Sequence, residues 1–218
     1  MTARTRWRLS LIAAAVLVVL GLAWLRFAPR HFPAPDFARV ARPPGEAERR
    51  VPLPILMLPR KDLDNGVGVV CVFVDRRRRD RTSLTVVFHD EDHPWTLVDR
   101  AYDLFRWSHF RRVMDVETFT YRHEGDEARP GAIDFDDVFA GDQRWDVLLA
   151  EHLSAVVRLD AFEQRDGRPV IYVNTWNHMF SQRDNNPGLE LVTISAYPVY
   201  QGDREDCEAI FRAVRAGE

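Results

Sequence analysis

Cysteine is scarce in this 218-residue chain, and its two cysteines, Cys71 and Cys207, stand far apart. Zinc sites built on cysteine need pairs a few residues apart, so this spacing excludes them. Both cysteines lie in apolar patterns: either they pair in an oxidising compartment, or they are buried and reduced. The sequence also lacks a nucleophile elbow, a P-loop, a dinucleotide-binding glycine pattern and an HExxH motif. We therefore expect a protein that is not an enzyme.

Acidic residues are absent before His31, where five arginines stand. The rest of the chain holds 33 acidic residues against 25 basic ones (30 minus 5), a net charge of −8. Lys61 is the only lysine. An acidic domain binds nucleic acid poorly, because phosphates are neutralised by clustered lysine and arginine. We therefore expect no nucleic-acid partner.

The longest apolar run, Leu9–Leu25, contains no charged residue, and Phe27 and Ala28 extend it. A run of this length predicts a transmembrane anchor over residues 9–28, after a cytoplasmic tail of residues 1–8. A cleaved signal peptide is the alternative, but the run is long for one and no small-x-small site follows it. The sequence thus predicts a single-pass membrane protein held by Leu9–Ala28 as a signal anchor. Its soluble domain would be extracytoplasmic, and periplasmic if the source is bacterial.

Residues 29–59 are rich in proline, which predicts an extended linker whose last part can dock as an edge strand. Residues 60–218 predict one domain with an α+β fold, a mainly antiparallel sheet with helices packed on one face. Alternating and continuous apolar patterns indicate the strands, and apolar residues at helical spacing indicate the helices. The strands are expected at Val67–Asp75, Ser83–His89, Arg112–Tyr121, Ala155–Glu163, Val170–Asn177 and Leu189–Tyr197, and the helices at Trp95–Trp107, Asp142–His152 and after Asp203.

The densest group of ionisable residues is the run from His89 to His93. Two imidazoles with intervening carboxylates can hold a divalent metal such as zinc if their donor atoms converge. The candidate ligands are His89, Asp92 and His93, with Glu91 as an alternative third ligand or general base. The same acids can instead cap the following helix, which leaves no cofactor.

A second polar group begins at Asn174 and continues through Asn177 and His178 into a polar loop. Polar side chains at a strand end before such a loop can line a ligand pocket. A two-residue turn at Asp166-Gly167 would place Arg158 and Asp160 on the same sheet face as Asn177. These five residues are the candidate binding site, and an ordinary solvent-facing sheet surface is the alternative.

The arginine-rich run from Asp75 to Arg81 is typical of a solvated hairpin turn in an acidic domain, or of a contact with an acidic partner protein. From the intact fold pattern and the missing catalytic motifs we expect a membrane-anchored, extracytoplasmic binding or assembly domain with an envelope protein as partner. The alternative is a metal-dependent hydrolase that acts on envelope material through the His89–His93 cluster.

Overall fold

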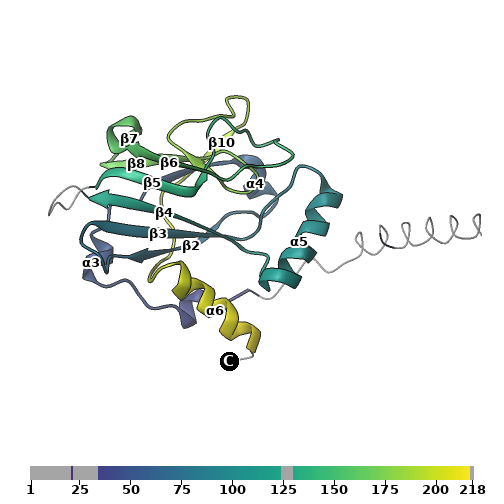
Figure 1. The fold of residues 1–218 in the computed structure, drawn as a ribbon, viewed down its shortest axis with the longest axis horizontal. Helices are drawn as coiled ribbons and strands as arrows, with labels where there is room; N and C mark the ends of the chain where they lie inside the picture. The colour runs from purple at the N-terminus through teal and green to yellow at the C-terminus, as the bar shows by residue number, and fades with distance from the viewer. Residues whose placement is uncertain (1–20, 22–33, 124–129, 217–218) are drawn as a thin grey trace, which may run out of the picture.

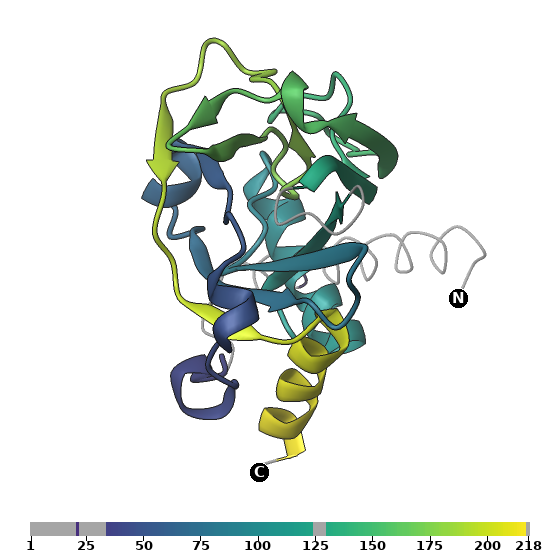
Figure 2. The same ribbon diagram turned by 90° about the vertical axis from the view of Figure 1, so that its left-hand side faces the viewer.

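The computed structural model describes residue 21, residues 34–123 and residues 130–216. Within these residues, eleven strands form one curled mixed sheet, which resembles half of a barrel (Figures 1 and 2). The sheet order is β10-β1-β8-β9-β5-β4-β3-β2-β11, with β6 paired to β5 and β7 paired to β8. The strands are β1 (Ile55–Pro59), β2 (Val69–Asp75), β3 (Arg81–Phe88), β4 (Asp115–His123), β5 (Pro130–Phe139), β6 (Leu153–Arg158), β7 (Gln164–Arg165), β8 (Arg168–Val173), β9 (Phe180–Ser181), β10 (Leu191–Ile194) and β11 (Val199–Gln201).

The helices are few and most of them are short. They are α2 (Phe37–Val40), α3 (Glu46–Arg49), α4 (Arg60–Asp64), α5 (Thr96–Phe110) and α6 (Arg204–Ala216), with a 3-10 turn, η1, at Leu159–Ala161. The predicted α+β fold, an antiparallel sheet with helices on one face, is therefore wrong: the described chain is strand-rich, and its sheet is mixed. Three pairs, β1 with β8, β2 with β11 and β5 with β9, run parallel. Parallel neighbours need long crossovers, which local hairpin patterns do not predict.

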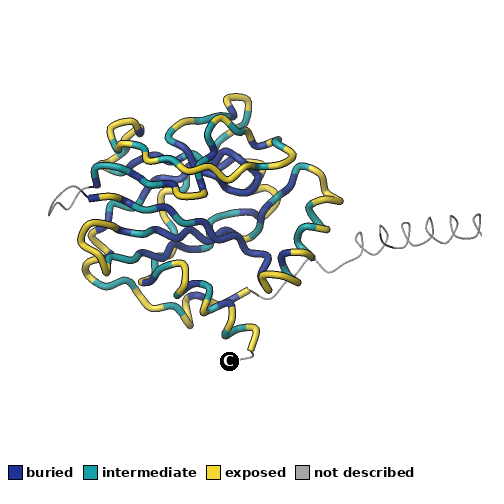
Figure 3. The backbone as a smooth tube through the Cα atoms, viewed as in Figure 1, coloured by how far each residue is buried: buried dark blue, intermediate teal, exposed yellow. Residues whose placement is uncertain are grey.

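The central strands are buried on both faces, as the continuous apolar run of β2 predicts. Val72 and Val74 belong to the large core inside the curl, which is filled mainly by phenylalanines and aliphatic side chains of β1, β3, β4, β5 and β8. Cys71 and Phe73 point to the other face and pack against Phe211 of α6. Figure 3 shows this burial concentrated in the middle strands. The hairpin of β2 and β3 is confirmed.

Three other expectations about secondary structure differ from the structure. The helix expected from Asp142 to His152 does not form, and this segment is a series of turns in which Trp145 is buried. Strand β6 pairs with β5 instead of β8, so the turn at Asp166-Gly167 joins only the two-residue β7 to β8. Within the segment predicted as a linker, residues 29–59, the structure places α2, α3 and β1 from residue 34 onward, and β1 lies between β10 and β8.

The predicted anchor, Leu9–Ala28, lies outside the described residues apart from Gly21. Among the residues that the structure describes, no helix is both long enough and apolar enough to cross a membrane. The prediction of a single-pass membrane protein with an extracytoplasmic or periplasmic domain is therefore not supported by the structure.

Candidate functional site

The strongest candidate site is a cleft of about 560 Å³ at the end of the sheet where β3 leads into α5. A volume of this size suits a small organic ligand. Three segments form its walls: the end of α4 with the turn after it, the connection from β3 to α5, and the first half of α5. Six of the lining residues are carboxylic acids, and we call this the acidic cleft: Asp64, Asn65, Val67, Asp90, Glu91, Asp92, Thr96, Asp99, Arg100 and Asp103.

Helix α5 is held on the sheet by charge and not by an apolar stripe. Its one buried residue is Arg106, which is only 2% exposed. Of the residues that the apolar spacing places on the buried face, Trp95, Val98 and Phe105 are 59%, 40% and 51% exposed. The fourth, Tyr102, is half-buried and its ring lies 5.8 Å from that of Trp176. Figure 3 shows α5 as mostly exposed or half-buried at the edge of the molecule. The sequence therefore predicts the helix correctly but the wrong buried face.

Arg106 is the centre of an ion-pair network beneath the acidic cleft. Its Nη2 lies 3.2 Å from Glu91 Oε1 and 3.3 Å from Asp115 Oδ1, and it donates to the Met114 carbonyl at 3.1 Å. Its Nη1 lies 3.6 Å from Asp90 Oδ1. A buried guanidinium needs such partners, because an unpaired charge in the interior costs several kcal/mol. The network therefore fixes α5 and the floor of the cleft together.

Asp115 extends this network inward to His178. The Nδ1 of His178 donates to Asp115 Oδ2 at 2.9 Å, and the imidazole stacks on Phe88 with ring centroids 3.9 Å apart. Burial alone would raise the pKa of Asp115. The hydrogen bond from His178 and the charge of Arg106 outweigh burial and hold this pKa well below its usual range. Asp115 is thus a permanent anion that balances Arg106.

Four carboxyl groups that line the cleft, those of Asp90, Glu91, Asp99 and Asp103, have raised pKa values. Burial, with the neighbouring charge of Asp103, raises the pKa of Asp90 to about 8. Burial and Asp99 raise the pKa of Asp103 to about 7, and burial raises that of Asp99 to about 6. Since like charges and desolvation both disfavour ionisation, part of this cleft is protonated near neutral pH. A cation that entered would favour the ionised forms.

Glu91 supplies a buried polar atom without a partner. The residue is 7% exposed and lines the cleft, and burial raises its pKa well above the ordinary value. One carboxylate oxygen, Oε1, pairs with Arg106, while Oε2 has no hydrogen-bond partner among the described residues. Buried polar atoms are rarely left unpaired, so an orphan oxygen in the wall of a cleft points to a ligand that would complete it.

The structure does not bring the predicted metal ligands together. His89 is exposed and its Nδ1 lies 3.1 Å from the Gly68 carbonyl. His93 is buried and both ring nitrogens are used: Nδ1 accepts the Trp95 N–H at 3.0 Å, so Nε2 donates to the Leu148 carbonyl at 3.2 Å. Asp92 accepts a hydrogen bond from Asn65. Nowhere in residues 34–123 and 130–216 do three or more His, Cys, Asp or Glu side chains form a group that could hold a metal.

The predicted binding residues separate into two places. Asn174, Asn177 and His178 are buried, at 1%, 5% and 0% exposed, and their hydrogen bonds stay inside the protein. They close a tight loop whose left-handed residue is His178, at φ 58°. Arg158, the last residue of β6, and Asp160 lie on the surface and form an ion pair of 2.8 Å with each other. Because β6 pairs with β5, the sheet face that would join the two sets does not form.

The sequence pattern assigns Asp90 and Glu91 to a helix cap or a metal cluster. It does not predict that Asp99, Asp103 and Arg106 belong to a site. The available signal is the spacing of these three residues, which puts them on one face of α5. An arginine and two acids on one helix face usually indicate solvent exposure. Only the contact with Asp115 on β4 reveals that this face is buried.

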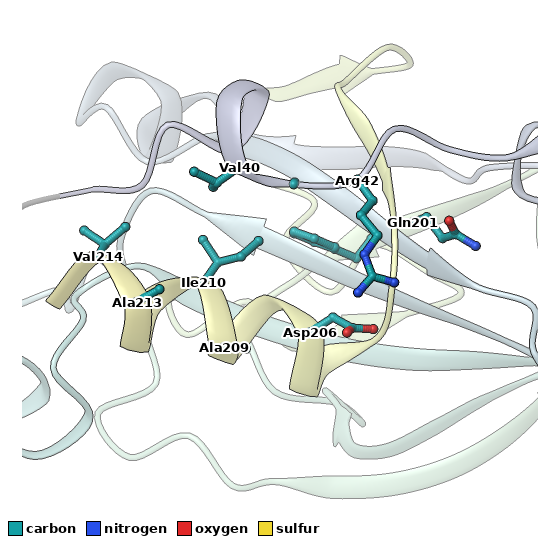
Figure 4. A pocket seen from close by; sticks show the side chains of 10 residues that line it. Val40, Arg42, Gln201, Asp206, Ala209, Ile210, Ala213 and Val214 are labelled. Carbon is teal, nitrogen blue, oxygen red and sulfur yellow. The ribbon is translucent and has the colours of Figure 1, made fainter. Parts of the chain in front are cut away.

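A second hollow, of about 290 Å³, lies between α6 and residues 40–42 (Figure 4). Val40, Ile210 and Val214 line most of it, while Arg42 and Asp206 stand at one end. Among its described lining residues no buried polar atom lacks a partner. This groove therefore carries no chemical signal comparable to that of Glu91.

Comparisons with protein-family models, with curated proteins and with solved structures find no match to this chain. The acidic cleft is therefore interpreted from its own geometry.

Proposed function

We propose that this chain is a non-catalytic binding domain that holds a cationic group, an ammonium or a guanidinium, in the acidic cleft. The observation that carries the proposal is the buried Oε2 of Glu91, which has no hydrogen-bond partner among the described residues. A positively charged N–H donor satisfies such an oxygen best, because hydrogen bonds between charged groups are shorter and stronger than neutral ones.

The charges around Glu91 support the same ligand class. Six carboxyl groups line the cleft, with Arg100 at its wall and Arg106 beneath it. A cation that displaces protons from Asp90 and Asp103 is attracted to the carboxylates that form. Its own positive charge balances their negative charge in the cleft. The donors do not converge as a metal site does, which favours an organic cation with several N–H groups over a metal ion.

The absence of a nucleophile elbow, a P-loop or an HExxH motif supports binding without catalysis. The histidine that is hydrogen-bonded to Asp115, His178, is 0% exposed and lies against Phe88. A general base must come within hydrogen-bond reach of a substrate, and this imidazole is shielded from the cleft's solvent.

The test is calorimetric titration of the full-length chain with agmatine, which carries a guanidinium and an ammonium. We expect binding at a pH above the pKa of Asp90, about 8, and weaker binding below the pKa of Asp99, about 6, as the cleft becomes protonated. The isosteric change Glu91→Gln removes the carboxyl group that a bound cation would hold in its ionised form. It should weaken binding by roughly 10- to 100-fold, since a hydrogen bond to a charged group is worth about 1.5–3 kcal/mol.

Two controls accompany this titration. Glu46→Gln removes an exposed carboxylate on α3, which Figure 1 shows at the opposite end of the molecule from α5, and it should leave the affinity unchanged. Butanediol has similar length but no charge and should not bind. Equal affinity of the wild-type and Glu91→Gln chains for agmatine, or equal binding of butanediol, would contradict the proposal.

A further inference from the structure

The turn between β2 and β3 carries the largest concentration of positive charge in the described chain. We call residues 76–81, which include five arginines, the arginine tip. Arg77 is held by Asp75 at 2.8 Å and by Asp203, whereas Arg78 and Arg81 lie 3.5 and 3.4 Å from Asp80. Arg76 and Arg79 have no ion-pair partner among the described residues. Among the described residues, these two guanidinium groups of the tip therefore remain without an ionic partner.

The arginine tip and the acidic cleft lie at opposite ends of the same strands. Strand β3 begins in the tip at Arg81 and ends at Phe88, directly before the cleft residues Asp90 and Glu91. Eight residues of strand span about 23 Å. Figure 1 shows α5 at one end of β2 and β3, with the turn that joins these strands at the other end.

This separation prevents the tip from filling the cleft of its own chain. It is also well beyond the screening distance of about 8 Å at physiological ionic strength, so the two poles do not neutralise each other. The molecule thus has a projecting cationic turn at one end and a hollow anionic site at the other. The two surfaces are complementary in charge between separate copies.

We propose that the arginine tip of one copy docks into the acidic cleft of a second copy, in a head-to-tail contact. The proposal rests on the proposed function, and it identifies the guanidinium groups of Arg78 and Arg79 as the ligand of that site. Such a contact uses two different surfaces, so it generates rings or open filaments instead of a closed two-fold dimer.

The chemistry of the rim fits arginine better than lysine. A guanidinium presents parallel N–H groups that pair with a carboxylate in a bidentate manner. Asp64 and Asp103 supply such carboxylates at the cleft. Trp95 stands next to the rim residue Thr96 and exposes 59% of its surface. An exposed indole is the best aromatic surface on which a guanidinium can stack. The side chain of Arg78 is 69% exposed and able to reach such a partner.

The experiment is sedimentation analysis of the full-length chain and two variants. In the tip variant, Arg78→Ser and Arg79→Ser remove two guanidinium groups. In the cleft variant, Asp64→Asn and Asp103→Asn remove two charges with little change of shape. We expect the wild-type mass to rise with protein concentration at low salt and to fall toward the monomer at about 1 M salt, where screening acts within ~3 Å.

The association constant of each variant alone should be lower than that of the wild type by a factor of about ten or more. The reason is that close charge pairs at interfaces couple by about 1.5 kcal/mol or more. An equal mixture of the two should restore association but stop at a heterodimer, since one intact tip meets one intact cleft. Circular dichroism of both variants checks that the sheet is retained. A heterodimer in the mixture is the result that a contact elsewhere on the surface does not produce.

Two results would overturn the inference: a wild-type chain that stays monomeric at low salt, or association that persists in both variants. Agmatine titration of the tip variant, whose cleft is intact, separates this failure from that of the proposed function. If agmatine binds there while the chains do not associate, the cleft takes a cation from another molecule. If agmatine does not bind and the chains do not associate, both proposals fail.

Discussion

Replacement of Asp62 by asparagine should change how the stability of this protein depends on pH. Asp62 lies in α4, is 1% exposed, and accepts the Trp145 Nε1–H at 2.6 Å through Oδ1. Its other oxygen, Oδ2, has no hydrogen-bond partner among the described residues. Burial, opposed in part by the charge of His178, raises the pKa of Asp62 from 3.8 to about 6. The Asp62→Asn variant would keep an oxygen that accepts from Trp145 and would lose the titration.

The magnitude follows from the two pKa values. The folded chain holds the Asp62 proton more tightly than the unfolded chain, so this group contributes stability below pH 3.8 that is lost as pH rises through about 6. Each pH unit between the two values is worth about 1.4 kcal/mol, which gives a loss of about 3 kcal/mol. The variant does not suffer this loss. The free energy of unfolding of the variant minus that of the wild type should therefore increase by about 3 kcal/mol from acid to neutral pH.

Urea unfolding of both chains across this pH range measures the difference directly, and the titration of all other groups cancels. Asp160→Asn is the matched control. The carboxylate of Asp160 is exposed and paired with Arg158, which lowers its pKa. The free energy of unfolding of Asp160→Asn minus that of the wild type should therefore not increase with pH. Parallel stability curves for the wild type and Asp62→Asn would refute the assignment of a buried, raised pKa to this residue.

Three further changes test other contacts of the fold. Arg106→Leu should lower the free energy of unfolding by about 3–5 kcal/mol in urea titrations, because it leaves Asp115 buried with one cation fewer; a loss below about 1 kcal/mol would contradict the buried network. Tyr121→Phe should cost about 1 kcal/mol in the same assay, because it removes the 3.0 Å hydrogen bond to the Pro52 carbonyl. Leu149→Ser should change stability by less than about 0.5 kcal/mol, because Leu149 is 84% exposed, and a larger loss would place this side chain in a contact.

Local patterns predicted the elements whose formation depends on neighbours in the chain. Helix α6 follows Asp203, whose carboxylate accepts the Asp206 N–H at 2.9 Å as a cap, and its apolar spacing buries Cys207 and Phe211. The β2–β3 hairpin forms where two apolar runs flank a charged turn. In both cases the information lies within about one element, so a linear sequence is enough.

The buried face of α5 shows why the candidate site could not be predicted. The regular spacing of Trp95, Val98 and Phe105 favours burial of the apolar side, by the usual balance of hydrophobic burial against charge. Arg106 reverses that balance because Asp115, on another strand, and Glu91, in the preceding connection, meet it at 3.3 and 3.2 Å. Such compensation depends on side chains that the fold brings together, and no periodicity records it.

Sheet order is the second feature that only the tertiary structure decides. The sequence predicts strands over most of β2, β3, β4, β8 and β10, since β-branched and apolar residues favour them wherever they pair. It does not say that β8 joins β1 in parallel or that β6 joins β5. The sequence by itself thus determined these strands, the last helix and the acidic character of the domain, but not the long strand β5. The curl of the sheet, the buried ion network and the acidic cleft arise from contacts between distant segments, whose energies no local pattern contains.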